Sequence, residues 1–205
     1  MTEKNLKVTF HDVNQGSKEW FDLRLGVATS SNFAKIMAND DKFGDPAKDY
    51  AERLALERRT LTRIETFKNE YMERGTNLEP EARALYEMEN FVKVENGGFF
   101  KSGWIGGSPD GLVGEGGIEI KSVIYGTHFE RLRKGGYDLK YKWQIQGNAL
   151  LAGLDWVDFV QYCPEFPPNK RLYVFRVERD EEMISALLDK LERFELLITD
   201  NLKLL

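Results

Sequence analysis

The sequence predicts an α/β fold in which a central mixed β-sheet is flanked by helices. Helical amphipathic patterns dominate before Phe91 and again at the C-terminus, and short β-rich segments separated by glycine lie between them. The 205 residues, 41% of them hydrophobic, are enough for one sizeable core and few for two. Repeats, low-complexity tracts and linkers are not apparent in the sequence, so we expect a single domain over residues 1–205.

The N-terminal half is predicted to be mainly helical. The expected elements are helices over residues 17–25, 30–37, 48–59 and 69–89, with a loop over residues 39–49. Ser17 is a suitable N-cap and Gly26 a suitable end for the first helix, and Ser30 or Ser31 can cap the second. The last helix is expected to break near residues 75–80 and restart near Leu78, because Pro80 is favoured in a first helical turn.

The C-terminal half is predicted to contain most of the strands. The expected elements are strands over residues 91–100, 104–113, 117–123, 156–163 and 171–178, and helices over residues 139–151 and 181–197. The first three strands are expected to form a meander, with residues 114–117 as the turn between the last two. Gly153 is expected to end the helix that begins near Leu139.

The composition indicates in which cellular compartment the protein is expected and which ligands a metal site could have. The N-terminus has no apolar run of the signal-peptide kind, and no apolar stretch approaches the roughly 20 residues that span a bilayer. We therefore expect an intracellular protein that does not contact membranes. Cys163 is the only cysteine and there are two histidines, which excludes an internal disulfide and a structural zinc site. Any bound metal would have oxygen ligands, as Mg²⁺ and Mn²⁺ prefer.

The charge distribution leaves two readings open. The net charge of −5 argues against a broadly DNA-binding surface, although it does not limit what a single cleft can hold. One segment combines basic and aromatic residues: Arg131, Arg133, Lys134, Tyr137, Lys140, Tyr141, Lys142 and Trp143. This segment either lies along phosphates or forms a solvated helix face.

The segment SPDG (Ser108–Gly111), followed by Glu119-Ile120-Lys121, is the candidate catalytic motif. Side chains alternate along a strand, so Glu119 and Lys121 share one face while Ile120 points into the core. Asp110 begins the partner strand, and hairpin pairing can bring its carboxylate beside Glu119. Two such carboxylates repel unless a cation lies between them, and the backbone carbonyl of Ile120 can add an oxygen ligand.

These residue types suit phosphodiester hydrolysis. The reaction needs an activated water and stabilisation of charge on the phosphoryl group, which divalent ions held by carboxylates supply. An ammonium group can position the water and offset developing charge. Each half of the motif also has a purely structural interpretation, SPDG as a type I turn and Glu-x-Lys as a surface ion pair. Their order on adjacent strands, followed by a glutamine-bearing helix, favours a nuclease.

The motif resembles that of the PD-(D/E)xK nuclease superfamily, whose core is restriction-endonuclease-like. The wider pattern is similar to the phage lambda exonuclease family, also called the viral recombinase or alkaline exonuclease group. The matching blocks are EWFDLRLGVATSSNFAKIMA (19–38), RGTNLEPEARALYE (74–87), GGSPDGLVGEGGIEIKS (106–122) and YKWQIQGNALLAGLDWVDFVQYCPE (141–165). The block containing LRLGVATSS narrows the resemblance to this family.

The resemblance implies a role for each matching residue. Asp110, Glu119, the Ile120 carbonyl and Glu79 would bind Mg²⁺, for which Mn²⁺ may substitute, while Lys121 would orient the attacking water and Gln144 would complete the catalytic set. Arg24, Ser31, Ser108 and Gln144 would bind a 5′-terminal phosphate, for which arginine offers a planar fork and a serine at a helix N-terminus a further donor. Met72 falls where the family places an apolar wedge at the duplex end.

The resemblance also implies an activity and partners. The family digests the 5′ strand of linear double-stranded DNA and leaves a 3′ tail for recombination. Its members form a ring-shaped homotrimer and act together with a single-strand annealing protein. The resemblance therefore implies that this chain is a phage or prophage product in a bacterial host. Two alternatives stay open: an endonuclease of the same superfamily, and a non-catalytic DNA-binding or recruitment module.

Overall fold

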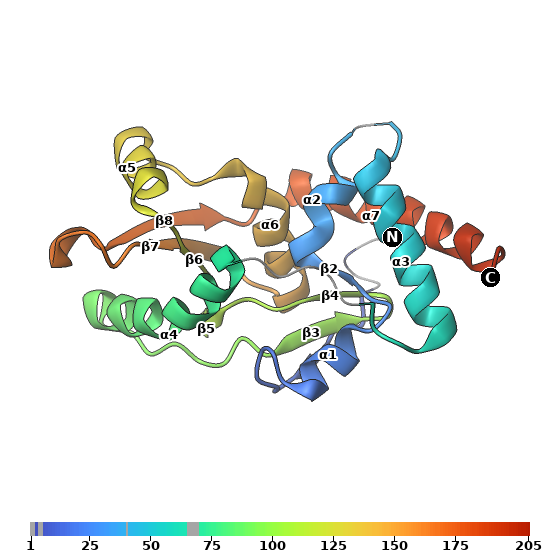
Figure 1. Cartoon of the computed structure of the whole chain (residues 1–205), viewed down its shortest axis with the longest axis horizontal. Coiled ribbons are helices and arrows are strands. Elements are labelled where there is room, and N and C mark those ends of the chain that lie inside the picture. The colour runs from blue at the N-terminus through green and yellow to red at the C-terminus, as the bar shows by residue number, and fades with distance from the viewer. Residues whose placement is uncertain (1–2, 4–5, 40, 65–69) are drawn as a thin grey trace.

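The computed structural model describes residues 3, 6–39, 41–64 and 70–205 and contains two β-sheets flanked by helices (Figure 1). The side chains of Tyr71 and Met72 also lie outside this description. The elements are β1 (Thr9–His11), α1 (Lys18–Arg24), β2 (Ala28–Thr29), the 3-10 turn η2 (Ser30–Asn32), α2 (Phe33–Ile36), α3 (Asp45–Thr60), α4 (Glu70–Asn90), β3 (Phe99–Ser102), β4 (Ile105–Gly107), β5 (Gly111–Val113), β6 (Gly116–Ser122), α5 (Tyr125–Lys134), η3 (Leu139–Tyr141), α6 (Lys142–Ala152), β7 (Trp156–Tyr162), η4 (Pro168–Lys170), β8 (Leu172–Glu178) and α7 (Glu181–Leu202).

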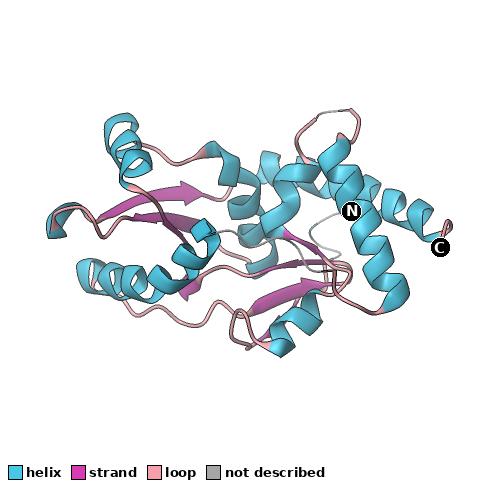
Figure 2. Ribbon diagram, in the orientation of Figure 1, coloured by secondary structure: helices cyan, strands magenta, loops and turns pink. Residues whose placement is uncertain are grey.

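Both sheets are mixed, which confirms the predicted α/β class, although the strands divide between two sheets instead of one. The first sheet has the order β1-β3-β4-β2, and in it only β2 and β4 run parallel. The second has the order β5-β6-β7-β8 and contains the parallel pair β6–β7. Parallel strands need a crossover connection, and here it carries α5 and α6. Helix α6 contacts strands of both sheets and lies between them in Figure 2.

The predicted three-strand meander is wrong. β3 pairs with β4 and β5 pairs with β6 across the expected turn, but β4 and β5 belong to different sheets. The chain between them passes close to other backbone and side-chain atoms. A Cβ at Gly107 would lie 2.7 Å from Asn148 Oδ1, and one at Gly97 would lie 1.8 Å from the Pro109 carbonyl oxygen. Glycine at these positions lets the SPDG segment cross from one sheet to the other.

The helices follow the predictions with several corrections. Ser17 caps α1 as expected, since its Oγ accepts a hydrogen bond from Trp20 N at 3.1 Å. Neither Ser30 nor Ser31 occupies a cap position, because both lie inside η2. Helix α3 begins at Asp45, so the loop predicted over residues 39–49 is shorter, and α7 continues past residue 197 to Leu202.

Helix α4 runs through Pro80 without the predicted interruption. Pro80 is exposed, while Ala82 and Tyr86 are buried in a cluster with residues of β6 and β7. This packing outweighs the backbone hydrogen bond that proline removes. Helix α5 was not predicted at all. Its only buried side chain is His128, and its apolar residues Tyr125, Phe129 and Leu132, although spaced as on one helix face, are exposed.

The largest hydrophobic core packs α3 and α7 against α2, β2 and β4. Phe194 of α7 is fully buried there and stacks on Tyr50 of α3 with ring centroids 5.6 Å apart. A second cluster joins α4 to β5, β6 and β7, and includes Ile118 and Ile120. In the part of the chain that the structure describes, no helix is long and apolar enough to cross a membrane.

Replacing Phe194 by alanine is expected to lower the free energy of unfolding by about 3–5 kcal/mol, because it leaves a cavity in this core. Leu196→Ala on the same helix is the matched control. Leu196 is 63% exposed, so its loss should change the free energy by no more than about 0.5 kcal/mol. Denaturant unfolding of both variants tests the assignment, and equal effects would contradict it.

Candidate active site

Strand β6 directs alternate side chains to opposite faces of its sheet. Ile118 and Ile120 pack in the cluster beneath α4, so Glu119 and Lys121 point to the other face, as the alternation predicts. Glu119 is fully buried there. A buried carboxylate is costly unless donors and countercharges surround it.

Three side chains surround the Glu119 carboxylate. Oε1 accepts hydrogen bonds from Lys121 Nζ at 2.5 Å and from Gln144 Nε2 at 2.5 Å. Oε2 accepts one from Asn148 Nδ2 at 3.2 Å. Gln144 and Asn148 are four residues apart and therefore lie on one face of α6. The sequence analysis missed Asn148, which this spacing from Gln144 could have indicated.

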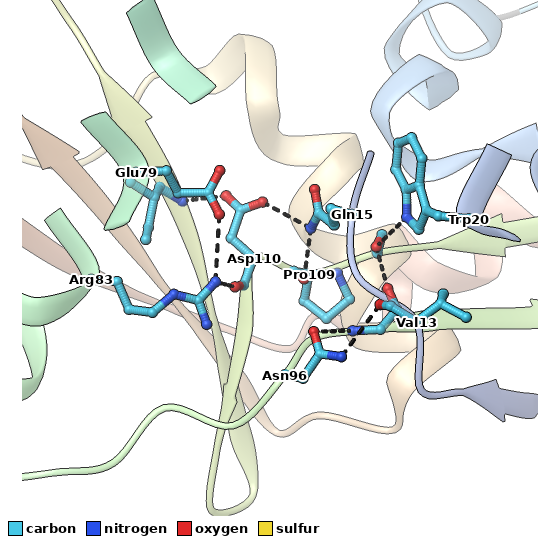
Figure 3. Close-up of polar contacts among 11 residues, drawn as sticks. Val13, Gln15, Trp20, Glu79, Arg83, Asn96, Pro109 and Asp110 are labelled. Atoms are coloured by element: carbon cyan, nitrogen blue, oxygen red, sulfur yellow. Dashed lines mark hydrogen bonds and ion pairs between the residues drawn. The ribbon is translucent and has the colours of Figure 1, made fainter. Parts of the chain in front are cut away.

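Asp110 is held against β6 from the adjacent turn. Its backbone N–H donates to the Ile118 carbonyl at 3.0 Å, and its Oδ2 accepts from Ile120 N at 2.7 Å. Gln15 Nε2 donates to the other carboxylate oxygen at 3.3 Å and to the Pro109 carbonyl at 3.2 Å. Figure 3 shows Gln15 reaching Asp110 from the opposite side to Glu79. Gln15 comes from the N-terminal segment, and the sequence analysis did not identify it.

Glu79 of α4 lies on the far side of Asp110 (Figure 3). Arg83, one helical turn later, places its Nη2 atom 3.4 Å from Glu79 Oε1 and also donates to the Asp110 carbonyl. Arg83 therefore ties α4 to the SPDG turn. Three predicted carboxylates and the predicted lysine thus meet at the junction of α4, α6 and β6.

The three carboxylates act on one another electrostatically. Burial and then repulsion from Asp110 raise the pKa of Glu79 to about 7. The same two causes raise the pKa of Glu119 above its usual value. Burial acts to lower the pKa of Lys121, but the carboxylates of Glu119 and Asp110 outweigh it and raise that pKa. Lys121 is therefore held as an ammonium within an acidic cluster.

The carboxylates are partnered by the chain's own cations and amides. Among the residues that the structure describes, no group of three or more His, Cys, Asp or Glu side chains has the arrangement of a ready-made metal site. The cluster nevertheless contains the hard oxygen donors that Mg²⁺ and Mn²⁺ take.

Arg24 and Ser31, two of the predicted phosphate ligands, meet around Thr29. Arg24 Nη2 lies 3.4 Å from Thr29 Oγ1, and Ser31 Oγ lies 3.3 Å from the same oxygen. Asn32 Nδ2 donates to it at 3.1 Å. The Arg24 guanidinium stacks 3.9 Å above the Trp20 ring, and burial lowers its pKa to about 10, which keeps it cationic at neutral pH.

Trp20 and Ser108 join this cluster to the carboxylates. Trp20 Nε1 donates to Ser108 Oγ at 3.1 Å, and Ser108 donates to the Gly98 carbonyl. The hydroxyl of Ser108 is thus engaged by its own chain, as the amide of Gln144 is by Glu119. Met72 falls in α4, and its side chain lies outside the described part of the structure.

Glu57 and Arg58 of α3 hold the turn after α1, and we call their contacts with Gly26 the Gly26 clamp. Gly26, which has φ +66°, donates its N–H to Glu57 Oε2 at 3.1 Å and accepts at its carbonyl from Arg58 Nε at 2.8 Å. Arg58 also forms a two-pronged ion pair with Glu195 of α7, at 2.6 and 2.9 Å. This clamp fixes the turn that follows Arg24.

The basic segment that the sequence analysis singled out is largely engaged internally. Lys134 pairs with Glu130 at 2.6 Å and Lys140 with Asp138 at 3.0 Å. Arg131 donates to the Gly135 carbonyl at 2.8 Å. These contacts favour the solvated-face interpretation for most of this segment.

Comparisons with known proteins identify the family and the fold. The sequence model of the YqaJ-like viral recombinase domain matches residues 19–155. The crystal structure of an alkaline exonuclease, LHK-Exo from Laribacter hongkongensis, is similar over 91% of this chain and 95% of that chain, with 33% identity and a TM-score of 0.83, and so is its complex with dAMP. A phage-related exonuclease from Haemophilus somnus 129PT shares the fold over 84% of this chain and 93% of that chain, with 18% identity and a TM-score of 0.70. Curated proteins gave no match.

The likeness to an alkaline exonuclease over nearly the full length of both chains confirms the predicted PD-(D/E)xK type of fold and the predicted enzyme class, a deoxyribonuclease. The family match spans all of the candidate carboxylates, Lys121 and the cluster around Arg24. The chain belongs to the YqaJ-like viral recombinase family.

Proposed function

We propose that the protein is a Mg²⁺-dependent exonuclease that digests the 5′ strand of linear double-stranded DNA and leaves a 3′ single-stranded tail. The observation that carries the proposal is the meeting of Asp110, Glu119 and Lys121 beside Glu79. The likeness to an alkaline exonuclease supports the reaction class, and the dAMP complex of that protein supports a nucleotide ligand.

The donor set fits a hard divalent cation. Asp110, Glu119 and Glu79 would hold it through carboxylate oxygens, and the Ile120 carbonyl would add a neutral oxygen. The mutual repulsion of these carboxylates is what a cation would relieve. When bound, such an ion lowers the pKa of water and offsets charge on the phosphate. We propose Mg²⁺ as this ion, with Mn²⁺ as a substitute.

Lys121 and Gln144 act within this frame as orienting groups. The Lys121 ammonium is kept charged by Glu119 and Asp110. It can therefore donate a hydrogen bond to the oxygen of the attacking water. As that oxygen bonds to phosphorus and the leaving oxygen departs, the ammonium also offsets the negative charge that develops. Gln144 and Asn148 fix the rotamer of Glu119, and through it they position Lys121.

Arg24 supports a preference for DNA ends that carry a 5′ phosphate. Within the described ranges its guanidinium forms no ion pair with a carboxylate, and it contacts the Thr29 hydroxyl, to which Ser31 and Asn32 also bond. A half-buried cation with hydroxyl and amide donors around it suits a terminal phosphate dianion. Ser108 would join by exchanging its present hydrogen bond for one to phosphate.

The family resemblance extends the proposal to assembly and partners. We propose a homotrimeric ring around the DNA, in which Met72 meets the duplex end, and a single-strand annealing protein that takes up the 3′ tail in phage-type recombination inside the host cell. A ring would hold DNA with little basic surface outside its channel, which agrees with a net charge of −5.

Linear duplex with 5′-phosphate ends should be degraded in Mg²⁺ faster than the same duplex with 5′-hydroxyl ends, while a closed circle survives. Arg24→Ala should reduce the ratio of the two rates toward one, and Arg24→Lys should fall between, because lysine keeps the charge without the fork. Gel analysis of product lengths measures this. Nicking of the circle would point to an endonuclease, and an unchanged ratio in Arg24→Ala would contradict the pocket.

Glu119→Gln and Lys121→Ala should each reduce the digestion rate by about 100-fold or more, because each removes a group that binds or orients at the reacting phosphate. Glu115→Gln is the matched control, since Glu115 is exposed in the turn of the same hairpin. Initial rates on linear duplex, with circular dichroism to verify folding, make the comparison. Full activity in either site variant would favour a non-catalytic DNA-binding or recruitment module.

Mg²⁺ should raise the thermal unfolding midpoint of the native chain, because binding to the folded state alone stabilises it by about 2.7 kcal/mol at a concentration 100 times Kd. Asp110→Asn should abolish most of this shift, and Glu115→Asn should preserve it. Thermal denaturation with and without Mg²⁺ measures the effect independently of activity. An equal shift in both variants would place the ion elsewhere.

A further inference from the structure

Three further cationic side chains, from α2, α3 and the segment after α3, lie near Arg24 and the site proposed for the terminal phosphate. Lys35 of α2 and Arg53 of α3 approach the ring of Tyr50, at 5.5 and 5.0 Å from its centroid. The Tyr50 hydroxyl accepts a hydrogen bond from Thr29 N at 2.9 Å, so these two cations adjoin the residue that Arg24 contacts.

Arg63 approaches the pocket from another direction. It follows α3, and its guanidinium lies 3.7 Å above the ring of Phe21. Phe21 in turn packs edge-on against Trp20, with ring centroids 5.0 Å apart. The guanidinium of Arg24 stacks on the ring of Trp20. Arg63 is thus linked to Arg24 through two aromatic rings, whereas Lys35 and Arg53 are linked to it through Tyr50 and Thr29.

These like charges are close enough to repel one another. After burial, Arg63 and Arg53 both act to lower the pKa of Arg24, and Arg53 likewise acts on Lys35. Two carboxylates act in the opposite direction, Glu57 on Arg24 and Asp49 on Lys35. Glu57 is engaged by the N–H groups of Gly26 and Ile64, and it forms no ion pair with the cluster.

The cluster differs from four other cations that lie on helices or at their ends. Lys18, Lys48, Lys134 and Lys203 each pair with a carboxylate three or four residues away on the same helix or at its end. Across the residues described here, Lys35, Arg53 and Arg63 form no such pair. In a protein of net charge −5, an unpaired cationic group of this size indicates an anionic ligand.

We propose that Lys35, Arg53 and Arg63 extend the pocket of Arg24 into a track that binds the backbone phosphates next to the DNA end. The proposal rests on the proposed function, since it takes a DNA end as the occupant of that pocket. A terminal phosphate carries a charge of about −1.5 to −2, which is less than four cations neutralise. A DNA strand supplies further negative charges at regular intervals.

The salt dependence of DNA binding tests the track. Binding of a short blunt duplex with 5′ phosphates is measured by fluorescence anisotropy in EDTA at several salt concentrations. Lys35→Gln and Arg53→Gln should each reduce the slope of log affinity against log salt by about one, and the double variant by about two, because each lost phosphate contact releases one counterion fewer. The preference for phosphorylated over hydroxyl ends should persist, since Arg24 is intact.

Lys203→Gln is the matched control for charge, because it removes one cation from the C-terminal end of α7, where Lys203 pairs with Asp200. Its slope should equal that of the native chain. An unchanged slope in the double variant, or an equal decrease in Lys203→Gln, would overturn the track while leaving the end pocket and the nuclease activity intact. Failure of the native chain to digest DNA would instead count against the proposed function.

Discussion

The burial of the Glu119 carboxylate is the constraint on which the site depends. A fully buried carboxylate is tolerated only with donors on both oxygens, and here these come from the same strand and from two successive turns of α6. The hydrogen bonds that Gln144 and Asn148 donate to Glu119 therefore hold α6 against β6. Because α6 also packs on η2, which carries Ser31 and Asn32, the contacts of α6 link the carboxylate cluster to the cluster around Arg24.

The parts that local rules govern could be predicted from the sequence. Strand alternation placed Glu119 and Lys121 together and Ile118 and Ile120 in the core. Capping identified α1 from Ser17 and the end of α6 from Gly153. The proximity of Asp110 and Glu119 followed from the same rules, because Asp110 directly precedes β5 and β5 pairs with β6 in one hairpin. The family resemblance, and not these rules, indicated Glu79.

The contacts between segments that are far apart in the sequence could not be predicted. Gln15 reaches Asp110 from a segment with no motif of its own, and the cations around Arg24 come from segments that are far apart in the sequence. Packing on β6 and β7 carried α4 through Pro80 against its local preference. The sequence left the role of the basic segment open, and the structure pairs its Lys134 and Lys140 with neighbouring carboxylates.

The Gly26 clamp gives the C-terminal helix an indirect share in positioning Arg24, the residue proposed to bind the terminal phosphate. Glu195 lies on α7, yet through Arg58 it holds the backbone next to Arg24. Changes on this remote helix can therefore alter the support of the residue proposed to bind a terminal phosphate without altering any atom proposed to touch DNA. Relatives that differ in turnover could in this way keep an identical binding surface and diverge only in its mechanical support.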